Sequence, residues 1–238
     1  MSASLVVALD FPDLDRALAL ADRLAGVDCW FKVGLELFTA EGPRTVAALK
    51  DKGRKVFLDL KFLDIPNTVQ GAVRSAARLG ADMLTLHLSG GQAMAEAALA
   101  GRADAGWDGT LLVGVTVLTS QALETGHDAG SPVLDLAHKA KAWYLDGVVC
   151  SGLEVGTVKS RVDQPFVCVT PGIRPDMAKA DDQQRVTTPK RAVADGSDFL
   201  VVGRPVTGAE DPAGAAERIL EEMRGAEARG LSRGGEHG

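Results

Sequence analysis

The sequence predicts an α/β protein built as a single (β/α)8 barrel, also called a TIM barrel. Short apolar runs rich in β-branched residues alternate with longer amphipathic segments, and eight such runs occur before residue 225. Apolar strands that alternate with helices are typical of a parallel sheet covered on both faces. The 238 residues, 46% of them hydrophobic, suffice for one large core. We therefore expect one barrel domain over residues 1–225.

The expected elements follow one another in regular order. The strands cover residues 5–9, 29–33, 56–60, 83–87, 111–117, 147–150, 166–170 and 199–202. The helices cover residues 14–24, after Asp13 as N-cap, then 42–51, 67–79, 92–99, 132–142, 153–160, 189–194 and 212–224. Residues 226–238 are rich in glycine and charge, so we expect a flexible C-terminal tail. A doubly wound open sheet is the competing fold, but its G-x-G-x-x-G turn is missing after the first strand.

Composition excludes several classes of function. The net charge of −6 is spread along the chain without a basic block, which argues against a nucleic-acid-binding surface. Apolar stretches are too short to span a membrane. The first strand begins almost at once, without a basic segment or a cleavage site, so we expect no signal peptide and a cytoplasmic protein.

The cysteines and histidines do not predict a metal site. Cys29, Cys150 and Cys168 are odd in number, far apart and in apolar surroundings, which is typical of buried reduced thiols. They form no C-x-x-C pair, and the four histidines form no H-x-x-x-H pair. We therefore expect no bound metal.

The most informative stretch covers residues 56–68. It begins as an apolar run and then places Asp59, Lys61 and Asp64 within six residues. Because side chains alternate along a strand, Asp59 and Lys61 lie on the same face, and Pro66 favours a helix that starts just after them. A structural ion pair is one interpretation. Since buried ion pairs seldom stabilise a fold more than apolar packing does, we favour a functional role.

A (β/α)8 barrel places its active site at the carboxyl ends of its strands. Other residues suited to binding lie late in the expected strands or just after them, and they converge there with Asp59 and Lys61. They are Asp10, Lys32, His87, Thr119, Ser120, Pro171, Gly172, Gly203 and Arg204. We expect the site where these residues meet, although no role for His87 follows.

The segment Asp59-Leu60-Lys61-x-x-Asp64-Ile65-Pro66-Asn67-Thr68 resembles the signature of the orotidine 5′-phosphate decarboxylases. The resemblance extends from residues 7–10 through 31–34 to 201–204. It implies an enzyme that converts orotidine 5′-phosphate to UMP, the last step of de novo pyrimidine nucleotide biosynthesis. Lys61 would be the proton donor within a charged array of Lys32, Asp59, Lys61 and Asp64.

The same resemblance implies how the nucleotide is held. Asp10, Lys32 and Thr68 would bind the ribose, Thr119 would lie at the pyrimidine, and Pro171, Arg174, Gln183, Gly203 and Arg204 would line or hold the phosphate end. The choice of Gln183 over Gln184 rests on its spacing before residues 185–186. The family also implies a homodimer in which Asp64, Ile65 and Thr68 serve the neighbouring subunit's site.

The residue types fit this chemistry. Loss of CO2 from C6 of orotate leaves a carbanion that the ring does not delocalise, so the site must supply a nearby positive charge. Lys61 can do this, because Asp59 and Asp64 favour its charged form, and it can also deliver the proton. Asp59 would crowd the substrate carboxylate. No cofactor is required.

The phosphate end has its own signals in the sequence. Gly203 lets the backbone approach an anion, and Arg204 can form a forked contact with its oxygens. The polar loop over residues 171–188 is longer than a simple connection and is expected to act as a lid, with a decorative insertion as the alternative.

Two other functions stay open at this stage. A sugar-phosphate decarboxylase or aldolase of the same superfamily would share the Asp-x-Lys-x-x-Asp core but use a divalent metal, and it would lack the Ile-Pro-Asn-Thr continuation. A non-catalytic barrel that binds a phosphate ligand is the third possibility. Sensitivity to EDTA separates the first two, and failure to turn over the nucleotide would favour the third.

Overall fold

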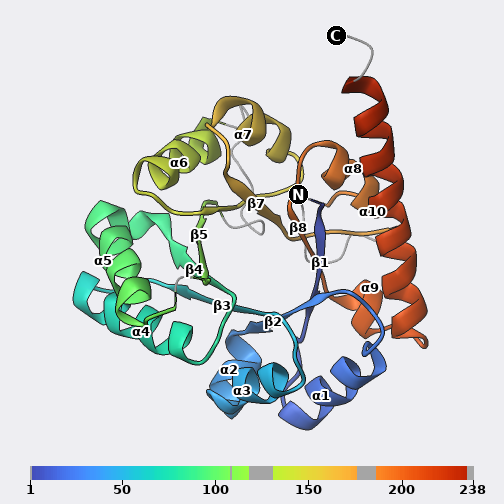
Figure 1. The fold of residues 1–238 in the computed structure, drawn as a ribbon, viewed down its shortest axis with the longest axis horizontal. Coiled ribbons are helices and arrows are strands. Elements are labelled where there is room, and N and C mark those ends of the chain that lie inside the picture. The colour runs from blue at the N-terminus through green and yellow to red at the C-terminus, as the bar shows by residue number, and fades with distance from the viewer. Residues whose placement is uncertain (1, 108, 118–130, 176–185, 235–238) are drawn as a thin grey trace.

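The computed structural model is a closed barrel of eight parallel strands surrounded by helices (Figure 1). It describes residues 2–107, 109–117, 131–175 and 186–234. The strands are β1 (Ser4–Ala8), β2 (Trp30–Gly34), β3 (Val56–Phe62), β4 (Met83–His87), β5 (Leu111–Val115), β6 (Gly147–Val149), β7 (Val167–Thr170) and β8 (Phe199–Val202). Each pairs in parallel with its neighbours, and β1 closes the ring on β8. The predicted fold class is confirmed.

Helices cover the outside of the barrel between successive strands (Figure 1). They are α1 (Leu14–Arg23), α2 (Leu35–Glu41), α3 (Arg44–Asp51), α4 (Pro66–Arg78), α5 (Gly91–Asp104), α6 (Ser131–Ala142), α7 (Val155–Arg161), α8 (Pro189–Ala194), α9 (Arg204–Thr207) and α10 (Pro212–Gly234), with a 3-10 turn η1 (Leu88–Gly90). Asp13 caps α1 as predicted, because its carboxylate accepts a hydrogen bond from the Arg16 backbone N–H at 2.9 Å.

The helix α10 corrects one expectation. We expected it to end at residue 224, but it continues to Gly234. Ala226 is buried, and Glu227 accepts a hydrogen bond from the Ala3 backbone N–H at 2.6 Å, so this part of the helix packs against the start of the chain. Alanine, glutamate and arginine also favour helix despite the glycines among them. The domain boundary at residue 225 stays a prediction.

The core has two parts. Inside the barrel lie Val6, Ala8, Phe57, Met83, Val113, Val169 and Val201. The larger part lies between the strands and the helices, and it takes the alternate strand residues, such as Leu5 and Val7. Cys29, Cys150 and Cys168 are buried free thiols, as predicted, and burial raises the pKa of Cys29 to about 12. No helix in the described ranges is long and apolar enough to cross a membrane.

Three aspartates, here called the rim aspartates, fix the amino-terminal end of the barrel. Each directly precedes an even-numbered strand, accepts a hydrogen bond from the first or second backbone N–H of the strand before it, and pairs with a cation from a helix or loop. Asp82 accepts from Val56 (2.8 Å) and Lys50 (2.7 Å), and Asp146 accepts from Leu112 (2.7 Å) and Arg102 (2.6 Å). Asp198 accepts from Cys168 (2.7 Å) and forms an ion pair with Lys159 (2.7 Å). These carboxylates tie neighbouring strands together.

Candidate active site

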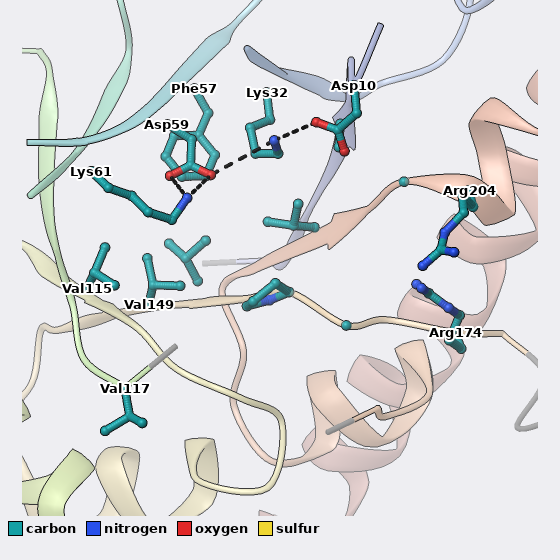
Figure 2. A pocket seen from close by; sticks show the side chains of 16 residues that line it. Asp10, Lys32, Phe57, Asp59, Lys61, Val115, Val117, Val149, Arg174 and Arg204 are labelled. Carbon is teal, nitrogen blue, oxygen red and sulfur yellow. Dashed lines mark hydrogen bonds and ion pairs between the residues drawn. The ribbon is translucent and has the colours of Figure 1, made fainter. Parts of the chain in front are cut away.

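A cavity of about 480 Å³ opens at the carboxyl ends of the strands (Figure 2). Most of the residues singled out in the sequence line it: Asp10, Lys32, Asp59, Lys61, Pro171, Gly172, Arg174, Gly203 and Arg204. Its apolar walls include Phe57, Val115, Val117 and Val149. The volume is in the range of pockets that hold small-molecule ligands. The structure therefore brings together residues from β1, β2, β3, β7 and β8, where a barrel carries its active site.

Four charged side chains form an alternating chain along one wall of this cavity (Figure 2). Lys32 Nζ lies 3.0 Å from Asp10 Oδ1 and 3.9 Å from Asp59 Oδ2. Lys61 Nζ donates to both carboxylate oxygens of Asp59 at 2.8 Å. The Lys32 and Asp59 side chains are 12% and 13% exposed, whereas Lys61 is 30% and Asp10 60% exposed. The two ends of the chain are thus open to a ligand, and its middle is sequestered.

The backbone of β3 changes course at Lys61. The strand shifts register between its pairs Leu58 with Leu84 and Phe62 with Leu86. Lys61 has φ of 51°, a left-handed conformation that costs a non-glycine residue of order 1–3 kcal/mol. Thr85, which is fully buried on β4, compensates in part: its Oγ1 accepts from the Lys61 backbone N–H at 2.8 Å and donates to Asp59 Oδ1 at 3.0 Å. Thr85 was not predicted, because one threonine in an apolar strand forms no pattern in the sequence.

His87 ends β4 beside this charged group. Partial burial lowers its pKa from the ordinary value, and the positive charge of Lys61 lowers it further, while Asp59 opposes the shift. The imidazole is therefore held toward its neutral form. The side chain does not line the cavity wall described above.

The remaining predicted residues lie elsewhere. Asp64, Ile65 and Thr68 are exposed around the start of α4 and do not line this chain's own cavity. Ile65 is 66% exposed, and its backbone N–H donates to Asp64 Oδ1 at 2.6 Å. Thr119, Ser120, Gln183 and Gln184 lie outside the described residues, so their predicted places stay predictions.

Two arginines lie at the opposite end of the cavity from Lys61. Arg174 follows β7, and Arg204 follows Gly203 at the end of β8. Figure 2 shows their guanidinium groups pointing toward each other. Arg174 Nη1 donates to the Ile173 carbonyl at 3.0 Å, which restrains the side chain. Two guanidinium groups directed at one space suit a multiply charged anion such as a phosphate.

The backbone that carries Arg174 is held by the segment just before α8, through an isolated bridge between Ile173 and Thr187. The Arg174 N–H donates to the Thr187 carbonyl at 2.9 Å, and the Thr187 N–H donates to the Gly172 carbonyl at 3.2 Å. Thr187 in turn packs on Gly152, just after β6, where an added Cβ would lie 2.3 Å from Thr187 Cγ2. The φ of Gly152 lies outside the left-handed region, so the glycine is required for space rather than for conformation.

The loop around Gly152 is itself fixed by a reciprocal pair of bonds. The Ser151 N–H donates to Glu154 Oε2 at 2.8 Å, and the Glu154 N–H donates to the Ser151 carbonyl at 3.0 Å. Both residues are buried. A rigid loop and the absence of a side chain at residue 152 thus set the position of Thr187, and through it that of Arg174.

The described residues contain no group of three or more His, Cys, Asp or Glu side chains that could hold a metal ion. The carboxylates of the cavity, Asp10 and Asp59, are engaged by lysines instead.

Comparisons with known proteins agree with the geometry of the site. Residues 3–219 match the family model described as orotidine 5′-phosphate decarboxylase / HUMPS family. The orotidine 5′-phosphate decarboxylase of Maridesulfovibrio salexigens is 55% identical over 228 residues, which are 93% of this chain and 99% of that protein. The one from Nitratidesulfovibrio vulgaris strain DP4 is 57% identical over 229 residues, 93% and 97% of the two chains. The crystal structure of the Lactobacillus acidophilus enzyme of that name matches with a TM-score of 0.82 and 37% identity, over 93% of this chain and 99% of that one. The chain therefore belongs to the orotidine 5′-phosphate decarboxylase / HUMPS family.

Proposed function

We propose that this protein decarboxylates orotidine 5′-phosphate to UMP, the last step of de novo pyrimidine nucleotide biosynthesis. The observation that carries the proposal is the alternating chain Asp10, Lys32, Asp59 and Lys61 in a cavity whose other end holds Arg174 and Arg204. Relatives with more than half of their residues identical over nearly the whole chain carry the name of this activity.

The chemistry follows from Lys61. The bond between C6 and the substrate carboxylate breaks, CO2 leaves, and the electron pair stays on C6. The Lys61 ammonium stabilises that pair and then gives up a proton to form the C6–H bond, after which the neutral amine takes a proton from water. Asp59, which accepts from Lys61 Nζ with both oxygens, orients the ammonium and favours its charged form. The reaction needs no cofactor, because Lys61 supplies both the charge and the proton.

The remaining contacts hold the nucleotide. Asp10, Lys32, Pro171, Arg174, Gly203 and Arg204 all line the cavity, which supports these roles. Asp10 and Lys32 would bind ribose hydroxyl groups, and Arg174, Gly203 and Arg204 would hold the phosphate, with Pro171 beside them. From the family resemblance, Thr119 contributes at the pyrimidine and Gln183 at the phosphate. Binding energy from the phosphate end, remote from C6, can be used to stabilise the transition state.

One assay tests this function against its alternatives. Purified protein is mixed with orotidine 5′-phosphate, with and without EDTA, and the loss of substrate and the appearance of UMP are followed. We expect equal turnover in both arms. Turnover abolished by EDTA would indicate a metal-dependent relative of the same superfamily, and tight UMP binding without turnover would indicate a non-catalytic barrel.

We further propose that each active site is completed by a second copy of the chain. Asp64, Ile65 and Thr68 are exposed at the start of α4, and Leu63 and Ile65 leave more than half of their apolar side chains in solvent. In a two-fold dimer the same patch meets itself, so each subunit would give these residues to its partner and receive the partner's copies. Asp64 would then join the charged array from across the interface.

Mixed dimers test the shared site. Lys61→Ala and Asp64→Ala homodimers should each be nearly inactive. After subunit exchange, one site of every mixed dimer takes Lys61 from one chain and Asp64 from the other and is intact. Equal reassortment makes about half of the dimers mixed, so activity should recover to roughly a quarter of wild type. Exchange without any recovery would mean that Asp64 serves its own subunit.

A further inference from the structure

We propose that Thr85 is a positioning residue for the reaction, which fixes the distance and direction between Asp59 and Lys61. The inference rests on the proposed function, and it assigns a role to a side chain that lies outside the cavity lining. Its basis is the pair of hydrogen bonds that join one buried hydroxyl to both residues.

The first step of the argument is the register of the sheet. Between the paired positions Leu58 with Leu84 and Phe62 with Leu86, β3 has three residues, and β4 has Thr85 alone. The strand segment of residues 59–61 is therefore longer than the partner it faces. A regular backbone ladder cannot satisfy such a segment, because the extra residues have no counterpart across the strand. The Thr85 hydroxyl takes this place by accepting from the Lys61 backbone N–H at 2.8 Å.

The second step is the hydrogen-bonding capacity of a hydroxyl. It has one O–H donor and two acceptor lone pairs. Because the Lys61 N–H occupies an acceptor position, the proton of Thr85 is free to point at Asp59 Oδ1, 3.0 Å away. One atom thus links the backbone of the proton donor to the carboxylate that holds the same residue's ammonium. The result is a small closed network in which Lys61 is held at both ends.

The third step concerns the conformation of Lys61. Its left-handed φ of 51° is rare for a residue with a side chain and persists where the surroundings impose it. The bond from Thr85 is one such restraint. Without it, the Lys61 backbone is free to relax, and the ammonium moves relative to C6 of the substrate. A misplacement of about 1 Å at a reacting group can lower a rate by about a hundredfold.

The experiment compares isosteric variants. Thr85→Val keeps the shape and removes both bonds, whereas Thr85→Ser keeps the hydroxyl. Thr110→Val is the matched control, because Thr110 is also fully buried and donates to the Ala81 carbonyl at 2.8 Å, before β5 and far from the cavity. The kcat and KM for orotidine 5′-phosphate, the Kd for UMP and the melting temperature are measured for each.

We expect Thr85→Val to lower kcat by about ten- to a hundredfold, while the UMP Kd changes by less than about threefold, since the contacts to ribose and phosphate come from other strands. Thr85→Ser should recover most of the rate. Thr110→Val should lose a similar amount of thermal stability without loss of kcat. If Thr85→Val does not fold, Thr85→Ala is measured instead, and the same changes in kcat and in the UMP Kd are expected.

Three results would overturn the proposal: a Thr85→Val enzyme with wild-type kcat, an equal loss in Thr110→Val, or a serine variant as slow as the valine one. Failure of the proposed function itself is distinguishable, because wild-type protein would then not turn over orotidine 5′-phosphate at all.

Discussion

The two ends of the barrel use the same residue types in different ways. At the amino-terminal end, each rim aspartate accepts a hydrogen bond from a backbone N–H of the neighbouring strand and also forms an ion pair with a lysine or arginine. At the carboxyl-terminal end, Asp59 is held by side chains, namely Lys61, Lys32 and Thr85. The first arrangement locks carboxylate, cation and strand together. The second holds the Lys61 ammonium at the cavity wall, where the side chain is 30% exposed.

The difference shows that position along the strand, rather than residue type, indicates the role of an aspartate–lysine pair in this barrel. An aspartate just before a strand meets the backbone of its neighbour, whereas an aspartate late in a strand faces the cavity. Variants at the two ends should therefore separate stability from activity.

The largest effect is expected for Lys61→Ala. If Lys61 is the proposed proton donor, removing its preorganised charge should raise the barrier by at least about 3 kcal/mol, which is more than about a hundredfold in rate. The melting temperature should change little, since Asp59 keeps Lys32 and Thr85 as partners. Lys50→Ala, at the other end, is the control and should show the opposite pattern, with normal turnover and lower stability. Near-wild-type turnover by Lys61→Ala would show that Lys61 is not the proton donor.

A smaller effect, on stability alone, is expected for Asp82→Asn. This buried carboxylate accepts from Lys50, Lys55 and the Val56 backbone, and the amide keeps its size but loses its charge. The free energy of unfolding should fall by about 1–3 kcal/mol, because charge-assisted bonds of a buried group are weakened. Denaturant titration measures the loss, and kcat should stay unchanged. A fall in kcat without a fall in stability would contradict the contrast between the two ends.

Gly152→Ala should affect the two arginines of the cavity and leave the charged chain around Lys61 unchanged. The added methyl group presses on Thr187 and shifts the backbone of Arg174. We expect kcat/KM for orotidine 5′-phosphate to fall about tenfold, or about 1.4 kcal/mol, while the slow reaction of the phosphate-free nucleoside is unchanged. Gly156→Ala is the control, since its Cβ would meet nothing nearer than 3.9 Å. The double variant with Thr187→Gly should restore activity. Equal losses on both substrates would mean that Gly152 supports the fold.

The smallest effect concerns His87. Burial and the charge of Lys61 lower its pKa, so NMR titration should give a value below 6.5, and Lys61→Ala should raise it. Because the folded protein then binds fewer protons than the unfolded chain, the stability contributed by neutral His87 is present above pH 6.5 and is lost as the pH falls through the folded pKa. His87→Asn should remove this part of the pH dependence. An unshifted pKa in both proteins would show that Lys61 does not act on the imidazole.

The fold was predictable because strands of a parallel barrel are continuous apolar runs, and eight of them recur along the chain. The helices α2 and α9 were not expected. The first follows Gly34 without a loop, and the second has four residues and contains Pro205, so neither shows a helical period. The end of α10 was misjudged because its packing against Ala3 is a tertiary contact, which local composition does not reveal.

The charged part of the site was predictable for the same reason, since Asp59 and Lys61 interrupt an apolar run. Thr85 and Gly152 were not, because their roles depend on what faces them across strands. The rim aspartates share a local backbone pattern in the structure. Gly80, Tyr144 and Gly196 all have positive φ, and each is followed two residues later by an aspartate that precedes a strand. The same three-residue pattern thus recurs at the amino-terminal end of the barrel. It consists of a residue with positive φ, then a small or apolar residue, then an aspartate.

The closure of β1 on β8 also governs when the active site can exist during folding. Ser4 pairs with Phe199, so this seam joins the segments of the barrel that are most distant in sequence. Contacts of such separation form late, because the entropy of closing the loop must first be overcome. Asp10 follows β1 and Arg204 follows β8, so the cavity wall between them is absent until the seam forms. Under the proposed function, a nucleotide bound between Asp10 and Arg204 would span the seam, and its binding energy would favour the closed ring.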